Sequence, residues 1–196
     1  MIFSSLDLAP EIQRALDECG YSQMTAIQQQ AIIPARRGKD ILANAQTGTG
    51  KTAAFALPIL QQMFDQPKPV VAGSPRALIL TPTRELAEQL AETIGRYAQF
   101  MPLTITALFG GVKKSAQQKK LRAGIDIVVA TPGRLLEHME QGKVKLSSVE
   151  FVVLDEADRM LDMGFIADVH ALLEKTPKKR QTLLFSATIS QAVKAL

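Results

Sequence analysis

The chain has 196 residues, of which 46% are apolar and 21% charged, and it carries a net charge of +4 at pH 7. At about 100 to 200 residues per domain, this length fits one globular domain and excludes an activity that two such domains complete together. No apolar run approaches the ~18 residues of a membrane span, and the segment from Met1 to Ala9 has no basic stretch before an apolar core, so no signal peptide and a cytoplasmic protein are expected.

Short apolar segments alternate along the chain with amphipathic ones. In chain order, strands are expected at 40–44, 76–81, 103–109, 126–130, 151–154 and 181–185. Helices are expected at 10–19, 51–64, 84–100, 113–122, 133–141 and 165–175. Several strands are apolar throughout, as Phe151 to Leu154 shows, which is typical of strands covered on both faces. The alternation predicts an α/β domain whose parallel sheet carries helices on both faces.

The first turn from a strand into a helix has the sequence Ala45-Gln46-Thr47-Gly48-Thr49-Gly50-Lys51-Thr52. Ligands of open α/β sheets bind outside the carboxyl ends of the strands, which is where such turns lie. The backbone N–H groups of a glycine-rich turn can bind a phosphate chain, with Lys51 reaching the terminal phosphates and the Thr52 hydroxyl binding Mg²⁺. Ala45 stands where the general pattern has glycine.

The run Asp155-Glu156-Ala157-Asp158 directly follows the apolar strand 151–154. Asp155 is placed to hold Mg²⁺ through water, and Glu156 to orient or deprotonate an attacking water. Alone, an acidic turn of this kind is more often a helix N-cap. Together with the glycine-rich turn it favours a nucleoside triphosphatase, with Lys51, Asp155 and Glu156 as catalytic residues and Thr52 and Asp155 as metal ligands. A lone Cys19 and two histidines leave no usual zinc spacing, so any metal should have oxygen ligands.

Three further turns offer backbone N–H groups, a hydroxyl or an arginine at a helix start. They are Pro82-Thr83-Arg84, Gly110-Gly111 and Thr131-Pro132-Gly133-Arg134. Such groups can hold the phosphates of an extended nucleic-acid strand without reading its bases. The nearby segment 111–125 has five basic residues and no acidic one, so the rest of the chain sums to a net charge of −1. A solvated helix face and a phosphate-attracting surface both account for that segment.

Two other segments are assigned no function. The cluster Lys175, Lys178, Lys179 and Arg180 is interpreted as a solvated loop. The stretch 66–75 contains three prolines and a glycine, which predicts a mobile surface loop.

In this combination the sequence resembles the DEAD-box RNA helicases of helicase superfamily 2, from Phe3 to Thr188 and with seven motifs in the family's order. Ala45 is usual at its position in that family. The resemblance implies a recombinase-like P-loop NTPase fold, ATP and Mg²⁺ as cofactors, and RNA as the partner. The segment from Gly110 to Arg134 looks most like the bacterial RhlE-type subgroup.

The resemblance also assigns residues to roles. Gly20-Tyr21, Thr25 and Gln28 match the family's glutamine motif, with Phe3 placed 17 residues before Gly20. This match implies that Gln28 hydrogen-bonds the adenine edge and that Tyr21 stacks on the base. Met24 and Ala26 stand where the family usually has proline, a departure that bears on loop rigidity and nucleotide affinity. The nucleotide-binding residues implied are Tyr21, Thr25, Gln28, Gln46, Thr47, Gly48, Thr49, Gly50, Lys51 and Thr52.

Two more sets of residues follow from the same resemblance. Contacts with RNA phosphates are implied for Pro82, Thr83, Arg84, Gly110, Gly111, Thr131, Gly133 and Arg134. Ser186-Ala187-Thr188 looks like the family's third motif, which links Asp158 to closure of two helicase domains around RNA. The match implies that residues 1–196 form one N-terminal ATP-binding domain, with an adenine-recognising segment at 1–28 and the P-loop core at 45–188.

Only eight residues follow Thr188, so the family's second helicase domain is expected to be absent. That domain supplies arginines to the γ-phosphate and half of the RNA groove. The chain is therefore expected to bind adenine nucleotide, contact RNA weakly and hydrolyse ATP barely. A monomer is expected, although the sequence itself does not indicate the oligomeric state. Two alternatives stay open. One is a P-loop small-molecule kinase, which would not need the Gln28 segment or the three phosphate-binding turns. The other is an RNA-binding module without catalysis, disfavoured by the presence of Lys51, Thr52, Asp155 and Glu156.

Overall fold

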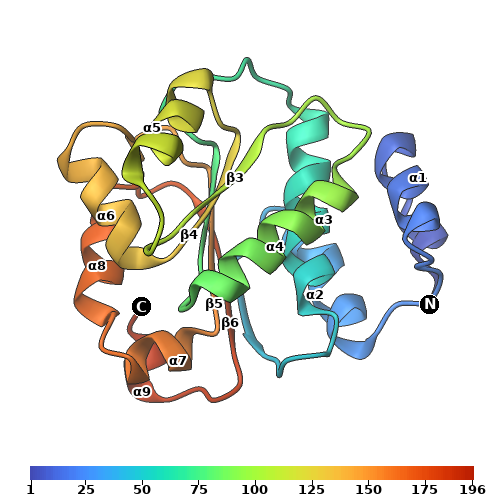
Figure 1. Ribbon diagram of the computed structural model, residues 1–196. Coiled ribbons are helices and arrows are strands. Elements are labelled where there is room, and N and C mark those ends of the chain that lie inside the picture. Colours follow the sequence, from blue (N-terminus) through green and yellow to red (C-terminus); the bar gives the residue numbers. More distant parts are fainter.

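The computed structural model describes all residues from Met1 to Leu196 and contains one sheet of six strands (Figure 1). The strands are β1 (Ile41–Asn44), β2 (Ala77–Leu80), β3 (Ile105–Leu108), β4 (Ile127–Ala130), β5 (Phe151–Asp155) and β6 (Gln181–Ser186). Their order across the sheet is β1-β6-β5-β2-β4-β3, and every neighbouring pair is parallel. The predicted parallel α/β sheet is confirmed.

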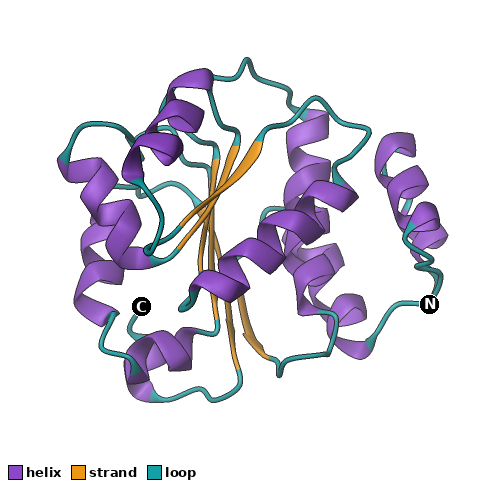
Figure 2. Cartoon of the chain, in the orientation of Figure 1, coloured by secondary structure: helices purple, strands orange, loops and turns teal.

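Helices cover both faces of this sheet, as predicted (Figure 2). Their bounds are η1 (Phe3–Leu6), α1 (Pro10–Glu18), α2 (Ala26–Arg36), α3 (Lys51–Asp65), α4 (Arg84–Tyr97), α5 (Lys114–Ala123), α6 (Pro132–Glu140), α7 (Ala157–Asp162), α8 (Ile166–Glu174) and α9 (Gln191–Lys194). Helices α1 to α4 lie on one face and α5 to α9 on the other (Figure 1). No helix is both long and apolar enough to span a membrane.

The sheet separates two hydrophobic cores, because successive side chains of a strand point to opposite faces. In β2, Ala77 and Ile79 belong to the core under α1 to α4. Leu78 and Leu80 belong to the core under α5 to α9. This arrangement explains why the central strands are apolar at every position, since each side chain has a buried partner on its own face.

Helix α2 is the main element that the sequence patterns do not predict. Pro34 lies inside it, and proline normally disfavours a helix interior. Its start does carry a recognisable signal: the Thr25 side chain accepts from the Gln28 backbone N–H while the Gln28 side chain accepts from the Thr25 backbone N–H. The short η1, α7 and α9 are also unpredicted. The other elements differ from expectation by at most three residues at their ends.

The irregular connection between α3 and β2 is held against the rest of the protein by Gly73, near the middle of the connection. The Gly73 N–H donates to the Leu121 carbonyl at 2.9 Å, and the Gly73 carbonyl accepts from the Lys145 N–H at 2.8 Å. A Cβ at Gly73 would lie 2.8 Å from the Lys143 carbonyl oxygen, so only glycine fits this close approach.

Candidate functional site

Each of the six strands is followed by one of the turns that carry the predicted functional residues. Because the strands are parallel, all six turns meet at the same edge of the sheet (Figure 1). The turn at 45–50 follows β1, the acidic turn follows β5, and Ala187-Thr188 follows β6. The three predicted phosphate-binding turns follow β2, β3 and β4, which are neighbours in the sheet.

The turn between β1 and α3 is shaped by its glycines. Gly48 and Gly50 have φ angles of +85° and +81°, in the left-handed region that favours glycine. The Thr49 hydroxyl donates to the Gln46 carbonyl at 2.6 Å and closes the turn. Helix α3 begins at Lys51, so its unpaired first N–H groups and the positive end of its dipole lie at this turn. These features suit a phosphate chain.

Lys51 joins this turn to the acidic turn. Its Nζ lies 3.0 Å from Asp155 Oδ1 and 4.0 Å from Glu156 Oε2. The Asp155 side chain is 1% exposed, and neither of its oxygens accepts a well-aligned hydrogen bond. Burial raises the pKa of Asp155 above its ordinary value, against the opposing effect of the Lys51 ammonium. A cavity of about 210 Å³ beside the turn is lined by Lys51, Thr52, Asp155 and Glu156, among others.

The glutamine motif packs directly on the glycine-rich turn. Gln28 Nε2 donates to the Gly50 carbonyl at 3.0 Å, and its Oε1 accepts from the Thr25 N–H at 2.9 Å. The Thr25 hydroxyl donates to the Thr49 carbonyl at 2.8 Å. Both ends of the Gln28 amide therefore have protein partners, and the residue is 4% exposed. The amide keeps a second N–H and a second acceptor site of its oxygen, so Gln28 could hydrogen-bond adenine while retaining these bonds.

Tyr21 belongs to a cluster of three aromatic side chains. Its ring stacks on Phe3 at a centroid distance of 5.9 Å and meets Tyr97 edge-on at 5.7 Å. The Tyr21 and Tyr97 hydroxyls are hydrogen-bonded at 3.0 Å. Burial of Tyr97 and its bond to Tyr21 raise the pKa of Tyr97 above its ordinary range. Phe3 and Tyr97 thus support the half-buried ring of Tyr21; Tyr97 carries no sequence signal because it ends an ordinary amphipathic helix.

The three residues predicted to couple the acidic turn to domain closure are brought together. Asp158 Oδ2 accepts from the backbone N–H and the hydroxyl of Thr188, at 3.1 Å and 3.0 Å. The Ser186 hydroxyl accepts from the Asp158 N–H at 3.0 Å and donates to the Thr188 carbonyl at 2.7 Å. Partial burial of Asp158 opposes its ionisation, but hydrogen bonding with Thr188 and Ser186 outweighs burial and lowers the pKa of Asp158.

The predicted phosphate-binding turns also lie together. Thr83 accepts from the Leu86 N–H at 3.3 Å and caps α4. The exposed Arg84 reaches across to the turn after β3, where its guanidinium lies 5.2 Å over the Phe109 ring. A Cβ at Gly111 would lie 3.1 Å from the Arg84 guanidinium. Gly110 and Gly111 are exposed, so their backbone groups face solvent.

Residues 25–196 match the family model described as DEAD/DEAH box helicase. The chain belongs to this family. It is 45% identical over 195 residues to the ATP-dependent RNA helicase DeaD of Mycobacterium tuberculosis, covering 99% of this chain and 34% of DeaD. It is 49% identical over 189 residues to the ATP-dependent RNA helicase SrmB of Haemophilus influenzae, covering 95% of this chain and 42% of SrmB.

The chain is similarly 46% identical to the ATP-dependent RNA helicase RhlB of Pseudomonas syringae, covering 97% of this chain and 49% of RhlB. A crystal structure of a hypothetical ATP-dependent RNA helicase from Sulfolobus tokodaii superposes with a TM-score of 0.87 at 39% identity, over 96% of this chain and 53% of that one. The chain therefore spans a third to a half of the length of these relatives. The matches establish the helicase fold and family for almost the whole chain.

In this DEAD-box domain, Arg134 points into the protein rather than toward solvent. Its side chain is 11% exposed, and its Nε lies 3.6 Å from Glu137 Oε2. Its terminal Nη1 donates to the Val112 carbonyl at 3.0 Å and to Gln117 Oε1 at 3.3 Å. The guanidinium thus connects the turn after β4 to the turn after β3. The predicted contact between Arg134 and an RNA phosphate stays a prediction.

Gln117 and His138, both unpredicted, complete this buried network. Gln117 Nε2 donates to the Phe109 carbonyl at 2.9 Å, which fixes the orientation of its amide, and its Oε1 lies 2.8 Å from His138 Nε2. His138 must therefore carry a proton on Nε2. Its side chain is 0% exposed and its Nδ1 has no hydrogen-bond partner. Burial, followed by the positive charge of Arg134, lowers the pKa of His138 below its ordinary value.

Acidification is therefore expected to destabilise the domain through His138. A histidine titrates near pH ~6.5 in the unfolded chain, whereas the folded domain holds His138 to a lower pKa. Between these two pKa values the unfolded state binds more protons than the folded state. The contribution of neutral His138 to the free energy of unfolding is therefore fully present above about pH 6.5, and it is lost as the pH falls through the folded pKa. The melting temperature should fall less between pH 7.5 and pH 5 in His138→Gln than in the parent. The exposed His170→Gln is the matched control, and equal shifts in all three proteins would contradict the prediction.

The basic segment 111–125 extends from the Gly110-Gly111 turn along α5. Lys114 pairs with Glu137 at 2.7 Å, while Lys113, Lys119, Lys120 and Arg122 are exposed and form no ion pair. Both explanations of this segment, a solvated helix face and a phosphate-attracting surface, stay open.

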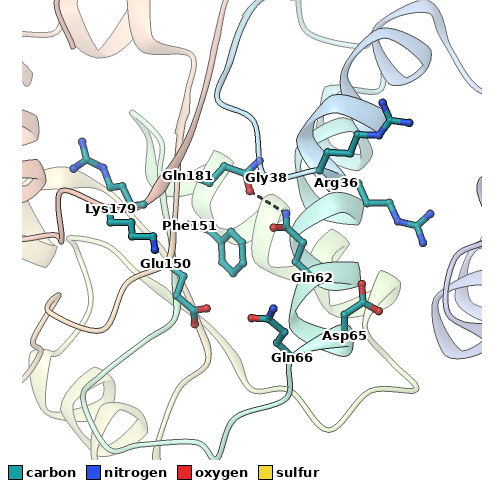
Figure 3. A pocket seen from close by; sticks show the side chains of 11 residues that line it. Arg36, Gly38, Gln62, Asp65, Gln66, Glu150, Phe151, Lys179 and Gln181 are labelled. Carbon is teal, nitrogen blue, oxygen red and sulfur yellow. Dashed lines mark hydrogen bonds between the residues drawn. The ribbon is translucent and has the colours of Figure 1, made fainter.

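The second basic cluster lies at the opposite edge of the sheet, where β5 and β6 begin. Lys179 and Arg180 line a cavity of about 570 Å³ together with Arg36, Gln62 and Glu150, among others (Figure 3). Across it, Gln62 Nε2 donates to Gln181 Oε1 at 2.9 Å. Gln181 Nε2 donates to the carbonyls of Ala35 and Lys39, both at 2.7 Å. These bonds join β6 to α2 and α3 far from the six turns.

Proposed function

We propose that this chain is the ATP-binding domain of an ATP-dependent RNA helicase. The observation that carries the proposal is the convergence of Lys51, Thr52, Asp155 and Glu156 on one cavity at the start of α3. Those groups are the phosphate-binding, metal-binding and water-activating parts of a nucleoside triphosphatase. The names of the relatives at 45% to 49% identity, each an ATP-dependent RNA helicase, support RNA as the substrate.

The acidic turn fits Mg²⁺. Both oxygens of Asp155 are buried and lack an aligned donor, so they can accept a further cation beside Lys51. Mg²⁺ typically binds one or two carboxylates together with phosphate oxygens and retained waters. Asp155 and the Thr52 hydroxyl would hold the ion, which when bound neutralises negative charge on the terminal phosphates.

The remaining steps, phosphate binding and activation of water, are carried out by groups of the protein itself. The N–H groups at the start of α3 and in the glycine-rich turn hold the phosphate chain in place. Lys51 contacts the terminal phosphates, and it shares its charge between them and Asp155, 3.0 Å away. Glu156 orients the attacking water and accepts its proton; with its side chain 16% exposed, this carboxylate is open to water.

The same proposal assigns the residues that bind adenine and those that bind RNA. Tyr21, Thr25 and Gln28 bind the adenine end, and the bonds of Thr25 to Thr49 and of Gln28 to Gly50 place this segment against the phosphate-binding turn. The turns after β2, β3 and β4 hold RNA phosphates. The Asp158, Ser186 and Thr188 cluster links the acidic turn to β6, and through it to closure of a second helicase domain.

The purified 196-residue chain provides the test. It should bind a fluorescent ATP analogue in the presence of Mg²⁺, prefer ATP over GTP, and hydrolyse ATP at a rate that RNA barely raises. Robust RNA-stimulated turnover by this chain alone would refute the need for a second domain. Phosphate transfer to a small metabolite would instead support the kinase alternative, and absence of nucleotide binding would support an RNA-binding module without catalysis.

A further inference from the structure

The exposed Gly110-Gly111 turn has almost no hydrogen bonds of its own. Gly110, Gly111 and Val112 make no backbone–backbone hydrogen bond. Gly111 has a φ angle of +84°, and the two glycines have no side chains with which to hold the turn. Its conformation must therefore be fixed by side chains from other elements.

Two bonded side chains supply that support from both sides of the turn. Gln117 Nε2 donates to the Phe109 carbonyl immediately before the glycines, at 2.9 Å. Arg134 Nη1 donates to the Val112 carbonyl immediately after them, at 3.0 Å. Gln117 Oε1 then accepts from Arg134 at 3.3 Å, so the two supports are joined to each other.

Gln117 also connects this support to the neighbouring turn. Arg134 ends the Thr131-Pro132-Gly133-Arg134 turn, and His138, which donates to Gln117 Oε1, lies one helical turn further along α6. Gln117 is 5% exposed, so water does not compete for these bonds. One buried amide therefore fixes the position of the turn after β3 relative to the turn after β4.

We propose that Gln117 is a positioning residue for RNA binding, which holds these two turns so that their backbone N–H groups face successive phosphates of one strand. The inference rests on the proposed RNA-binding function. Donors that are already in place bind an anion more tightly than donors that must first be ordered, because the ordering cost is subtracted from the affinity. Gln117 itself would not touch RNA.

Glutamine suits this position because its NH2 group donates to the Phe109 carbonyl while its oxygen has two acceptor sites, one for Arg134 and one for His138. Glutamate would keep acceptors for Arg134 and His138 but would lose the donor to the Phe109 carbonyl. Leucine would remove all three bonds and leave the buried Arg134 and His138 without their acceptor. Gln117→Leu should therefore weaken the support of the two turns more than Gln117→Glu does.

The test measures RNA and nucleotide affinity of the same variants. Fluorescence anisotropy with a labelled single-stranded RNA at several low salt concentrations should show about tenfold weaker binding by Gln117→Leu and an intermediate loss for Gln117→Glu. The slope of log affinity against log salt should decrease by ~0.7 for each RNA phosphate that the variant no longer binds. The affinity for a fluorescent ATP analogue should stay within twofold. Gln118→Leu, at the next position on α5, is the matched control.

A second readout follows the turn itself. In the NMR spectrum of the labelled chain, Gly110 and Gly111 amides should become more mobile in Gln117→Glu, while those of Gly48 and Gly50 stay unchanged. A merely structural role would weaken RNA and ATP binding together and leave the salt slope unaltered, which would overturn the inference. If Gln117→Leu does not fold, the Gln117→Glu results decide in the same way.

The outcomes separate this inference from the function on which it rests. A parent chain that binds no RNA even at low salt would refute the RNA surface and the inference with it. A parent that binds RNA, beside folded Gln117 variants that bind it equally well, would refute the inference alone.

Discussion

Lys51→Ala is expected to raise the dissociation constant for ATP by at least about 100-fold, which corresponds to ~2.7 kcal/mol. The Lys51 ammonium lies within 4.0 Å of both Asp155 and Glu156, and it stands at the first position of α3. Without it, the terminal phosphates would face two carboxylates with no ammonium between them. Titration of a fluorescent ATP analogue in the presence of Mg²⁺ measures the effect.

The same substitution removes the cation partner of a buried carboxylate, so stability must be measured beside affinity. Removing one partner of a buried ion pair typically lowers the free energy of unfolding by about 3 to 5 kcal/mol. The loss is smaller to the extent that Asp155 becomes protonated and therefore neutral. The double variant Lys51→Ala, Asp155→Asn should recover stability without recovering ATP binding. Lys114→Ala, which breaks an exposed pair with Glu137, should bind ATP normally. A folded Lys51→Ala protein with parental ATP affinity would show that Lys51 does not contact the phosphates of ATP.

Glu156→Gln is expected to lower the rate of ATP hydrolysis by about 10² to 10⁴-fold in the full-length helicase of which this chain is the proposed ATP-binding domain, with ATP affinity changed only a few-fold. The amide has nearly the shape of the carboxylate but cannot accept a proton from water. Lys51 is 4.0 Å from Glu156 and has Asp155 as its closer partner, so it keeps its position in the variant. Phosphate release at saturating RNA and ATP measures the rate.

A charge-matched control distinguishes proton transfer from a change in the local field. Asp162→Asn removes one exposed carboxylate at the end of α7, the helix that Glu156 precedes. This variant should hydrolyse ATP at nearly the parental rate. Comparable losses in both variants would attribute the effect to charge, and unchanged hydrolysis in Glu156→Gln would place the general base elsewhere.

The sheet could be predicted from sequence because strands buried on both faces are apolar at every position. Phe151 to Leu154 is such a run, and the structure buries each of its side chains. Helix α2 could not be found by the same criterion, because Pro34 and a run of three glutamines interrupt its apolar pattern. Its capping box, Thr25 with Gln28, was the available signal. In this chain the same residues serve as a helix start and as the contact with the glycine-rich turn.

The meeting of the functional turns could also be predicted, because parallel strands bring their carboxyl ends to one edge. The directions of individual side chains could not. Arg134 has the residue type of a phosphate ligand, yet its guanidinium is directed inward by Val112 and Gln117. Gln117 lies in the polar run Gln117-Gln118-Lys119-Lys120, which suggests a solvent-exposed face. Its burial depends on how α5 packs beside α6, which no local pattern encodes.

The strand order has a consequence for how the two ligands communicate. The proposed nucleotide-binding turn follows the edge strand β1, the farthest of the proposed RNA-binding turns follows the opposite edge strand β3, and four strands lie between them. At ~4.8 Å per strand, these turns are about 24 Å apart. Salt at physiological strength screens charges over about 8 Å, so phosphates of ATP and of RNA bound at these two turns would not repel each other appreciably. If the two proposed sites bind these ligands, the coupling between them is not direct repulsion and must be carried by the protein between the two turns.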